Sequence, residues 1–185
     1  GQEALYEVNL RSGIVEVISA PGERVRAGAV GPDGAYYLVS ARSGDWQLWR
    51  FERGSEDRQQ LTHHGSHRPF LPGDGFVYFT RLDRYGVWRV PVNGGEEELV
   101  TEIVQFATHE TWVVRGEWLY APVYDEEENI HILRLALDGS GGEEKLLSSE
   151  PAKAGMLRDV SPDGERFLFS RIEAGREDIV AVVGI

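Results

Sequence analysis

The sequence predicts an all-β fold, a β-propeller built from four-stranded antiparallel blades, about four of which lie in this chain. A glycine-bearing turn recurs as Gly31-Pro32-Asp33-Gly34, Pro72-Gly73-Asp74-Gly75 and Ser161-Pro162-Asp163-Gly164, with a degenerate copy at Arg115-Gly116. The glycines at 34, 75, 116 and 164 follow one another at intervals of 41, 41 and 48 residues. A short apolar run follows each turn. A repeat of about 40 to 50 residues made of short strands is typical of a propeller.

Each repeat is expected to hold one strand before this turn and one after it. The strands before the turn are expected at 26–31, 67–71, 109–114 and 156–161, and those after it at 35–41, 76–81, 118–123 and 166–171. β-Branched and aromatic residues, as in the run 76–80, favour strands over helices. In the turn, Pro presets φ, Asp caps its own backbone and Gly accepts a positive φ.

A third run is the most regular part of the repeat. It aligns without gaps at 5–8, 48–51, 87–90, 132–135 and 179–182, and a fourth run returns at 14–19, 59–62, 98–101 and 145–148. Hairpin turns such as Asn93-Gly94-Gly95 join the two runs in most copies. Four strands joined by short hairpins form an antiparallel meander, which is a propeller blade.

We therefore expect one domain over residues 1–185, with a partial first blade at 3–20, repeats at 24–64, 65–102 and 103–149, and a last blade at 155–185. The partial blade holds third and fourth strands, and the last blade lacks its fourth. An N-terminal fourth strand could complete the last blade and remove an exposed edge. Three arrangements stay open: a closed four-bladed ring, a larger ring finished by a second copy, and a part of a longer propeller.

Composition and charge narrow the classes of partner. The net charge is −12, and the excess lies in residues 93–185, which carry 8 basic and 20 acidic residues against 11 and 11 in residues 1–92. Nucleic acid is disfavoured as a partner because phosphate recognition needs a basic face. The sequence has no cysteine, which excludes disulfides and leaves cytoplasm and periplasm both open. No run approaches the ~18 apolar residues of a spanning helix, so no membrane insertion is expected.

The repeats resemble those of the TolB-type propeller proteins of bacteria. The segment 86–96 is similar to a recurrent blade ending in those proteins, and the tail 160–171, closing with Glu177-Asp178-Ile179-Val180, is similar to their C-terminal blade. The propellers attached to winged-helix, CadC-like regulators offer the nearest comparison. The resemblance covers essentially the whole chain. It implies a binding or sensing module, and blades of this kind also cap some prolyl-oligopeptidase-type enzymes. The chain departs from the pattern in its small number of blades and in the turn Val114-Arg115-Gly116.

No catalytic constellation emerges from the motifs, so we expect no enzyme activity, no cofactor and no metal. A Gly-x-Ser-x-Gly elbow is missing from the sequence, the His-Glu pair at 109–110 lacks the second histidine of a zinc peptidase, and the glycines at 139–142 lie between strands. His63, His64 and His67 could hold a divalent metal, but a solvated loop is favoured. The acidic run 125–128 lacks the spacing and the glycine of a calcium loop.

Loops on one face of the propeller form the candidate site. In a meander blade, the loops from strand four to the next strand one share a face with those from strand two to strand three, and loops on a rigid scaffold carry binding. The residues expected on this face are His63, His64, His67, Arg42, Trp46, Arg81, Arg84, Tyr85, Arg171 and Arg176. Trp46 is the better ligand candidate among the tryptophans, because Trp49 and Trp88 occupy equivalent positions expected in the core. The Pro-Asp-Gly turns are expected on the opposite face, where their residues set the backbone geometry of the turn.

The sequence thus predicts a non-catalytic binding or sensory propeller domain of a larger bacterial protein, which engages a protein or a small molecule through this loop face. Two alternatives stay open. One is an accessory propeller that gates or docks a peptidase-type enzyme. The other is a self-association module in which the surplus third strand and the incomplete blade join two copies into a homodimer.

Overall fold

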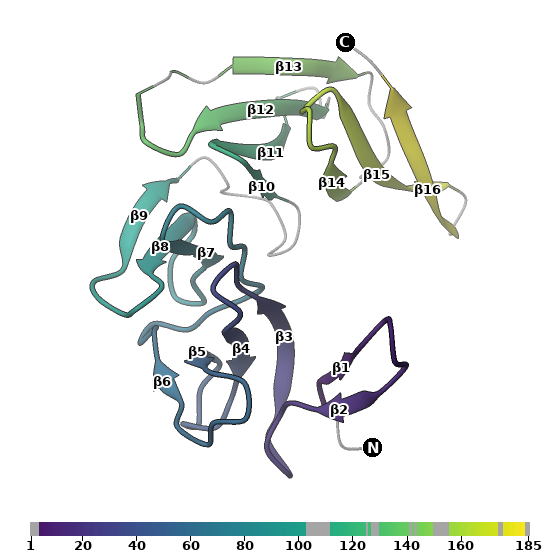
Figure 1. The fold of residues 1–185 in the computed structure, drawn as a ribbon. Coiled ribbons are helices and arrows are strands. Elements are labelled where there is room, and N and C mark those ends of the chain that lie inside the picture. The colour runs from purple at the N-terminus through teal and green to yellow at the C-terminus, as the bar shows by residue number, and fades with distance from the viewer. Residues whose placement is uncertain are drawn as a thin grey trace. The chain divides into compact units, whose positions relative to one another are not determined.

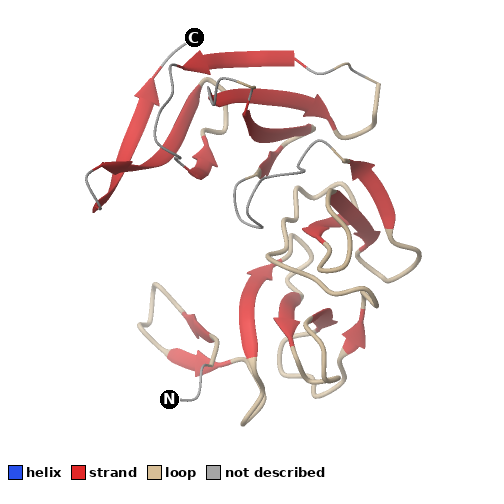
Figure 2. Ribbon diagram, turned by 180° about the vertical axis from the view of Figure 1, so that it is seen from behind, coloured by secondary structure: helices blue, strands red, loops and turns tan. Residues whose placement is uncertain are grey.

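The computed structural model describes residues 4–102, 112–124, 126, 130–140, 142, 144–149, 156–173 and 176–183. Strands and turns account for these residues, and no helix occurs among them (Figures 1 and 2). It follows that the described residues contain no helix long and apolar enough to cross a membrane. The predicted all-β class is confirmed.

The strands form five sheets. They are β1 (Tyr6–Val8) and β2 (Val15–Val17); β3 (Val25–Val30), β4 (Tyr36–Ser40), β5 (Gln47–Phe51) and β6 (Gln59–Gln60); β7 (Phe76–Thr80), β8 (Val87–Pro91) and β9 (Glu98–Thr101); β10 (Val113–Arg115), β11 (Trp118–Tyr124), β12 (Ile130–Ala136) and β13 (Glu144–Ser149); and β14 (Met156–Val160), β15 (Arg166–Glu173) and β16 (Arg176–Val183). In each sheet the hydrogen-bonded neighbours are consecutive along the chain. The predicted meander blades are therefore present, including the two-stranded first blade and the three-stranded last one.

One predicted strand is not formed as expected. Over residues 67–71 the chain makes only an isolated antiparallel bridge, from Phe70 to Tyr78. Pro69 has no backbone N–H, and Pro72 follows the segment, so a regular ladder cannot develop there. The backbone N–H of Phe70 still donates to the carbonyl of Tyr78 at 2.9 Å, which keeps the segment beside β7. The strand expected at 109–114 begins at Val113, and residues 109–111 lie outside the described residues.

By compactness the chain divides into unit 1, Gly1–Arg84 with Trp88–Glu98, and unit 2, Tyr85–Val87 with Leu99–Ile185. The single domain expected from the sequence stays a prediction.

In unit 1, β4 is buried along its whole length. Tyr37 and Val39 join one core cluster, which also holds Leu48, Phe79 and Trp88. Tyr36 and Leu38 join a second cluster with Val25 and Phe51. Alternate residues of a strand point to opposite faces, so this blade buries both of its faces.

Unit 2 has its own buried side chains. Trp112, Leu119, Ile132 and Leu157 are fully buried. The ring of Tyr120 on β11 meets Phe167 on β15 edge to face, with 5.9 Å between the ring centroids. Aromatic pairs in this geometry add about 0.5 to 1.5 kcal/mol beyond the area that they bury.

The aspartates of the Pro-Asp-Gly turns do more than shape the backbone, which corrects the expectation from the sequence. Asp33 Oδ1 accepts a hydrogen bond from the N–H of Ala35 at 3.1 Å. Its Oδ2 accepts from the Tyr37 hydroxyl at 3.1 Å and from Arg50 Nη2 at 3.0 Å. Asp33 therefore connects its turn to β4 and β5, the two strands that follow it.

These contacts shift the titration of the groups involved. Burial opposes ionisation of Asp33, but the hydrogen bonds from Arg50, Ala35 and Tyr37 outweigh it and lower the pKa of Asp33. In the next repeat, the Tyr78 hydroxyl donates to Asp74 Oδ2 at 2.6 Å. Burial and this hydrogen bond raise the pKa of Tyr78 to about 12. The contacts of Asp33 thus favour its ionised form, and those of Tyr78 favour its neutral form.

Candidate functional site

Several of the predicted loop-face residues meet in a loop cluster, which we define as Arg81, Asp83, Glu97, His63 and His64. Arg81 Nε and Nη2 donate to the two carboxylate oxygens of Asp83 at 2.8 and 2.5 Å. His64 Nδ1 lies 3.5 Å from Asp83 Oδ2, and Arg81 Nε lies 3.7 Å from Glu97 Oε2. The backbone N–H of His63 donates to Glu97 Oε1 at 2.7 Å. The hydrogen bonds from Arg81 also hold the pKa of Asp83 below its usual value.

Arg81 acts mainly as an internal brace of this cluster. Its side chain is 11% exposed, and its guanidinium lies 4.2 Å from the centroid of the Trp88 ring. The same arrangement occurs one repeat earlier, where Arg42 lies 5.0 Å from the centroid of the Trp49 ring. Bidentate pairing and ring stacking together fix an arginine in place. Arg81 is therefore poorly available to a partner.

The three predicted histidines do not converge on one point. His64 faces Asp83, His67 Nδ1 lies 3.2 Å from Arg26 Nη1, and His63 Nδ1 lies 3.3 Å from Gln60 Nε2. In the part of the chain that the structure describes, no group of three His, Cys, Asp or Glu side chains is placed to hold a metal ion. The acidic run 125–128 lies outside the described residues apart from Glu126.

Trp46, the tryptophan predicted to contact a ligand, is half-buried directly before β5. Its ring packs against the core cluster of Tyr37 and Phe79. Arg26 lies 4.4 Å and Arg24 lies 5.2 Å from its ring centroid. The aromatic surface of Trp46 is thus largely occupied by the protein's own side chains.

The remaining predicted residues are more scattered. Arg84 is exposed and lies 5.7 Å from the centroid of the Trp88 ring, and Tyr85 is 70% exposed. Arg171 lies in β15 and Arg176 begins β16, at the same end of this strand pair, because Glu173 pairs with Arg176. Arg171 was expected at the end of the strand 166–171 and Arg176 in the loop after it, and the structure places both within strands.

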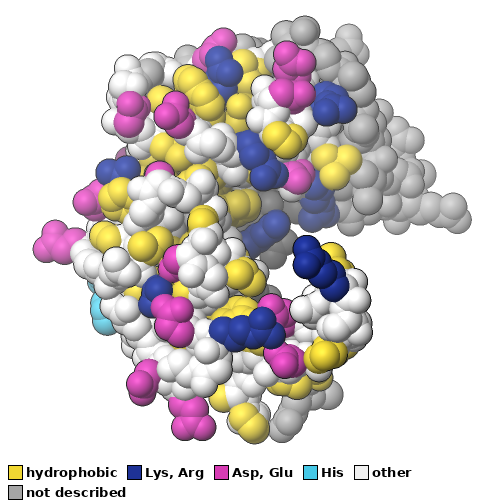
Figure 3. Space-filling model, viewed as in Figure 1, with side chains coloured by type: hydrophobic (Ala, Val, Ile, Leu, Met, Phe, Trp, Pro, Cys, Tyr) yellow, Lys and Arg dark blue, Asp and Glu magenta, His cyan; other side chains and the backbone are white. Residues whose placement is uncertain are grey.

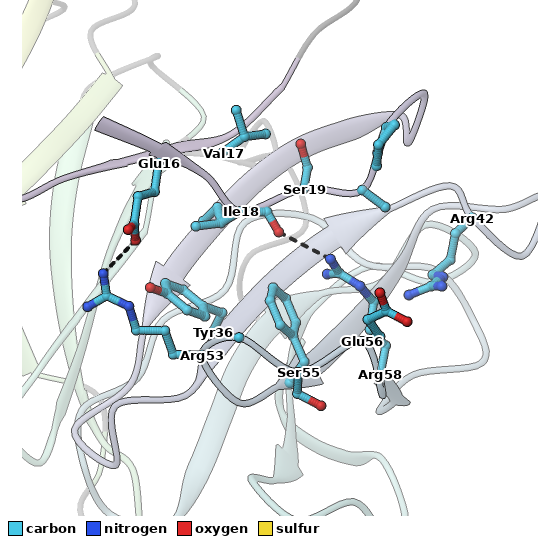
Figure 4. A pocket seen from close by; sticks show the side chains of 14 residues that line it. Glu16, Val17, Ile18, Ser19, Tyr36, Arg42, Arg53, Ser55, Glu56 and Arg58 are labelled. Atoms are coloured by element: carbon cyan, nitrogen blue, oxygen red, sulfur yellow. Dashed lines mark hydrogen bonds and ion pairs between the residues drawn. The ribbon is translucent and has the colours of Figure 1, made fainter. Parts of the chain in front are cut away.

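A cleft of about 910 Å³ lies in unit 1 (Figure 4). It is lined by residues 16–21, by the connection from β5 to β6 (residues 53–56 and Arg58) and by Tyr36, Phe51 and Arg42. In the space-filling view, basic and acidic side chains lie together in the hollow between the β1–β2 hairpin and the neighbouring sheet (Figure 3). A volume of this size suits a small molecule.

The hairpin side of the cleft is held by an arginine bridge. Glu7 and Glu16 lie directly opposite each other on β1 and β2, an arrangement that is unfavourable for like charges. Arg53 Nη2 lies 3.0 Å from Glu7 Oε2 and 2.6 Å from Glu16 Oε2, so one positive charge bridges the two carboxylates. The Tyr36 hydroxyl donates to Glu7 at 2.7 Å. These contacts attach the hairpin to the four-stranded sheet and keep the cleft open between them.

The opposite side of the cleft is built on Arg58. Its side chain is 8% exposed, and its guanidinium lies 3.8 Å from the centroid of the Phe51 ring. Arg58 Nη2 donates to the carbonyl of Ile18 at 3.1 Å (Figure 4). Tyr36 and Phe51 stack beside it, with ring centroids 5.3 Å apart and planes inclined by 28°. The cleft therefore combines an aromatic wall with a buried cation.

Sequence reasoning found only Arg42 of this cleft. Most of its lining comes from two segments. One is the connection between the third and fourth strands of a repeat (residues 53–58), and the other begins in the fourth strand of the repeat before it (residues 16–21). No motif connects the two segments. The sequence indicated one feature of the hairpin side of the cleft. Alternation in the run 5–8 places Glu7, which contacts Arg53, on the face opposite Tyr6 and Val8.

No known protein family and no curated protein matches the chain in sequence. Solved structures do match in fold. TolB from Acinetobacter baumannii matches with a TM-score of 0.70 and 16% identity over 97% of this chain and 46% of that one. A putative TolB from Agrobacterium tumefaciens matches with a TM-score of 0.69 and 19% identity, over 95% of this chain and 64% of that one. A puromycin-hydrolyzing peptidase from Mycobacterium tuberculosis matches with a TM-score of 0.58 and 14% identity, over 89% of this chain and 28% of that one.

The fold is thus a TolB-like β-propeller fold, which confirms this part of the resemblance seen in the sequence. Identities this low establish the fold alone. The chain spans about half the length of the first of these proteins, 46% of it.

Proposed function

We propose that the chain is a non-catalytic binding or sensory propeller domain of a larger bacterial protein, and that its cleft in unit 1 takes a small ligand. The cleft carries the proposal. It has a volume of about 910 Å³, a stacked aromatic pair on its wall and arginines beside that pair. Apolar walls with a few placed polar groups are the usual composition of small-molecule sites.

The resemblance of the repeats to the propellers of winged-helix, CadC-like regulators supports the sensory form of this proposal. In such an arrangement, ligand binding in the propeller would be passed to another domain of the same protein. The sequence neighbouring this chain in its full-length protein is the direct test: a winged-helix segment supports the sensory form, and a peptidase domain contradicts it.

The predicted loop face fits a ligand less well than the cleft does. Arg81 is paired with Asp83, and Trp46 is covered by Arg24 and Arg26. Arg84 and the exposed Tyr85 remain as the contacts we propose for a protein partner on that face.

A fragment screen by two-dimensional NMR tests the ligand-binding proposal. We expect hits that shift the amides of residues 16–20 and 53–58. The variant Ala20→Phe, which adds a ring to the cleft lining, should lose these hits, whereas the control Ser43→Phe, on an exposed loop away from the lining, should retain them. Hits that map to the loop cluster, or that survive Ala20→Phe, would contradict the assignment to the cleft.

The outer face of the β1–β2 hairpin favours self-association as a second candidate function. Tyr6 pairs with Val17 and Val8 pairs with Val15, and these four side chains are 51% to 59% exposed. Monomeric proteins rarely leave such a row uncovered. The occupant we propose is a second copy, because two copies of this uncharged row can meet without placing like charges together, although each chain carries −12.

Solution mass decides this second candidate. Sedimentation equilibrium should give a dimer for the wild type and a monomer for Val8→Glu, while Leu82→Glu, which alters an exposed leucine elsewhere, should leave the dimer intact. A monomeric wild type at high concentration would remove self-association.

An accessory propeller beside a peptidase-type enzyme is the other alternative. Its support is the likeness to the puromycin-hydrolyzing peptidase, 28% of which this chain covers. We propose that the chain itself has no hydrolase activity. Puromycin hydrolysis by the isolated chain would contradict this.

A further inference from the structure

Arg58 brings a cationic donor with an unused N–H to the cleft. Arg58 faces Glu23, whose Oε2 lies 3.7 Å from Nη2. That carboxylate is already engaged, because Oε2 accepts from the N–H of Ala20 at 2.8 Å and Oε1 accepts from the Ser40 hydroxyl at 2.7 Å. Among the described residues, Arg58 Nη1 has no hydrogen-bond partner. An unpaired buried cationic donor is unfavourable. Nη1 has almost no exposed surface, so an anion in the cleft pairs with it when the Arg58 side chain turns toward the cleft.

Arg42 adds a second positive charge to the same cleft. Its side chain is exposed, lines the cleft and lies against the Trp49 ring. Burial lowers the pKa of Arg58, the Glu23 carboxylate opposes this shift, and the charge of Arg42 lowers the pKa further. Two cations that line the same cleft favour an anion that contacts both.

We propose that the cleft binds a small organic carboxylate, with its carboxylate group accepting hydrogen bonds from Arg58 and Arg42 and its body held in the cleft. This inference rests on the proposed ligand-binding function and names the chemical class of the ligand. Guanidinium groups match the planar geometry of a carboxylate, and hydrogen bonds between two charged groups are the strong ones.

The acidic residues of the cleft favour a monoanion over a dianion. Glu16 and Glu7 share Arg53, so one positive charge offsets two carboxylates on this side of the cleft. Glu56 lines the cleft with an exposed side chain and repels any anion that enters. A phosphate monoester carries close to two charges at neutral pH and is repelled more strongly than a carboxylate. The ligand chemistry is therefore assigned as carboxylate and not as phosphate.

Titrations of the whole chain with three ring compounds of similar size test this assignment. Benzoate is the carboxylate probe, benzamide is its neutral counterpart and phenyl phosphate is the dianion. In NMR titrations, we expect benzoate to shift the amides of residues 18–20 and 53–58 in a saturable way. Benzamide should bind at least about tenfold more weakly, since it loses the charge-assisted hydrogen bonds. Phenyl phosphate should also bind more weakly than benzoate.

Two variants and a matched control assign the effect to the two arginines. Arg42→Gln, at an exposed position that should not impair folding, should weaken benzoate binding by about tenfold and leave benzamide binding unchanged. Arg58→Lys keeps the charge and removes Nη1, and it should also weaken benzoate binding. Arg11→Gln removes the same charge from an exposed position outside the cleft lining and should have no effect.

The outcomes separate the two proposals. Equal affinity for benzamide and benzoate, or stronger binding of phenyl phosphate, would overturn the carboxylate assignment and leave a ligand-binding cleft. Absence of saturable benzoate shifts up to about 20 mM would overturn the carboxylate assignment as well, because two charge-assisted hydrogen bonds should give millimolar affinity. The fragment screen with Ala20→Phe reports on the proposed function independently of this result.

Discussion

Removing the carboxylate of Asp33 tests whether the turn aspartate connects its turn to the blade. The side chain accepts three hydrogen bonds, from the N–H of Ala35, the Tyr37 hydroxyl and Arg50 Nη2, at 3.0 to 3.1 Å. Asp33→Ala removes both carboxylate oxygens and with them all three hydrogen bonds, and it leaves the hydroxyl of the fully buried Tyr37 without this acceptor. We therefore expect Asp33→Ala to destabilise unit 1.

The size of the loss follows from the exposure of each partner. The bonds to Ala35 and Tyr37 are each worth about 1 kcal/mol. The ion pair with Arg50 is worth about 0.5 kcal/mol, because the Asp33 side chain is 38% exposed and solvent screens the pair. The total is about 2.5 kcal/mol. Asp163 occupies the equivalent turn, where its Oδ1 accepts from the N–H of Glu165 at 3.1 Å and from the Ser161 hydroxyl. Asp163→Ala should cost about 1 kcal/mol.

The pH dependence provides a second measurement on the same residue. Folding lowers the pKa of Asp33 below its ordinary value of 3.8, so folding favours the ionised form. This stabilisation is fully present above about pH 4 and is lost as the pH falls through the folded pKa. Asp33→Asn keeps the acceptor for Ala35 but cannot ionise. The difference in unfolding free energy between the wild type and Asp33→Asn should therefore shrink below pH 4.

Urea unfolding followed by circular dichroism, at pH 7 and at several values below pH 4, gives both quantities. Equal losses for Asp33→Ala and Asp163→Ala would refute the reasoning, since the contacts to Tyr37 and Arg50 would then contribute nothing. A difference between wild type and Asp33→Asn that does not change with pH would refute the assigned role of the charge.

Three further predictions concern stability and the cleft. Folding raises the pKa of Tyr78 to about 12, so the neutral hydroxyl stabilises the fold below about pH 10 and this contribution is lost as the pH rises toward 12. In urea unfolding at several alkaline pH values, Tyr78→Phe should show a smaller loss of stability than the wild type, and an unchanged pH profile would contradict this prediction. Gly65→Ala should lower the melting temperature more than Gly34→Ala, because a Cβ at 65 would lie 2.7 Å from a neighbouring side chain whereas the space at 34 is open; equal shifts would argue against the close packing. Glu56→Gln should tighten benzoate binding a few-fold in the NMR titration because it removes the repelling carboxylate, and weaker binding would contradict the proposed pose.

Local patterns in the sequence predicted the strands well. The turn glycines at 34 and 164 adopt φ values of +80° and +75°, as the Pro-Asp-Gly turns require. The alternation in these runs also indicated where strands begin and end. The one irregular segment, 67–71, carried its own warning in Pro69, because a proline cannot donate to a strand ladder.

The candidate site was much less predictable. The three histidines at 63, 64 and 67 are close in sequence, but each contacts a different partner. The loop position of Trp46 suggested a free ring, but Arg24 and Arg26 lie over it. Whether a loop side chain is available depends on which strand lies beside it, and the spacing of residues along the chain does not say so.

The sequence by itself determined the repeat, the meander of each blade and the all-β class, because turn chemistry and strand alternation act over a few neighbouring residues. Only the tertiary structure decided where a ligand could bind. The cleft depends on contacts such as Arg53 with Glu16 and Arg58 with the carbonyl of Ile18, which join residues 37 and 40 positions apart. These contacts form when the first hairpin packs against the next blade, and that packing depends on side-chain fit between blades, which no short pattern in the chain records.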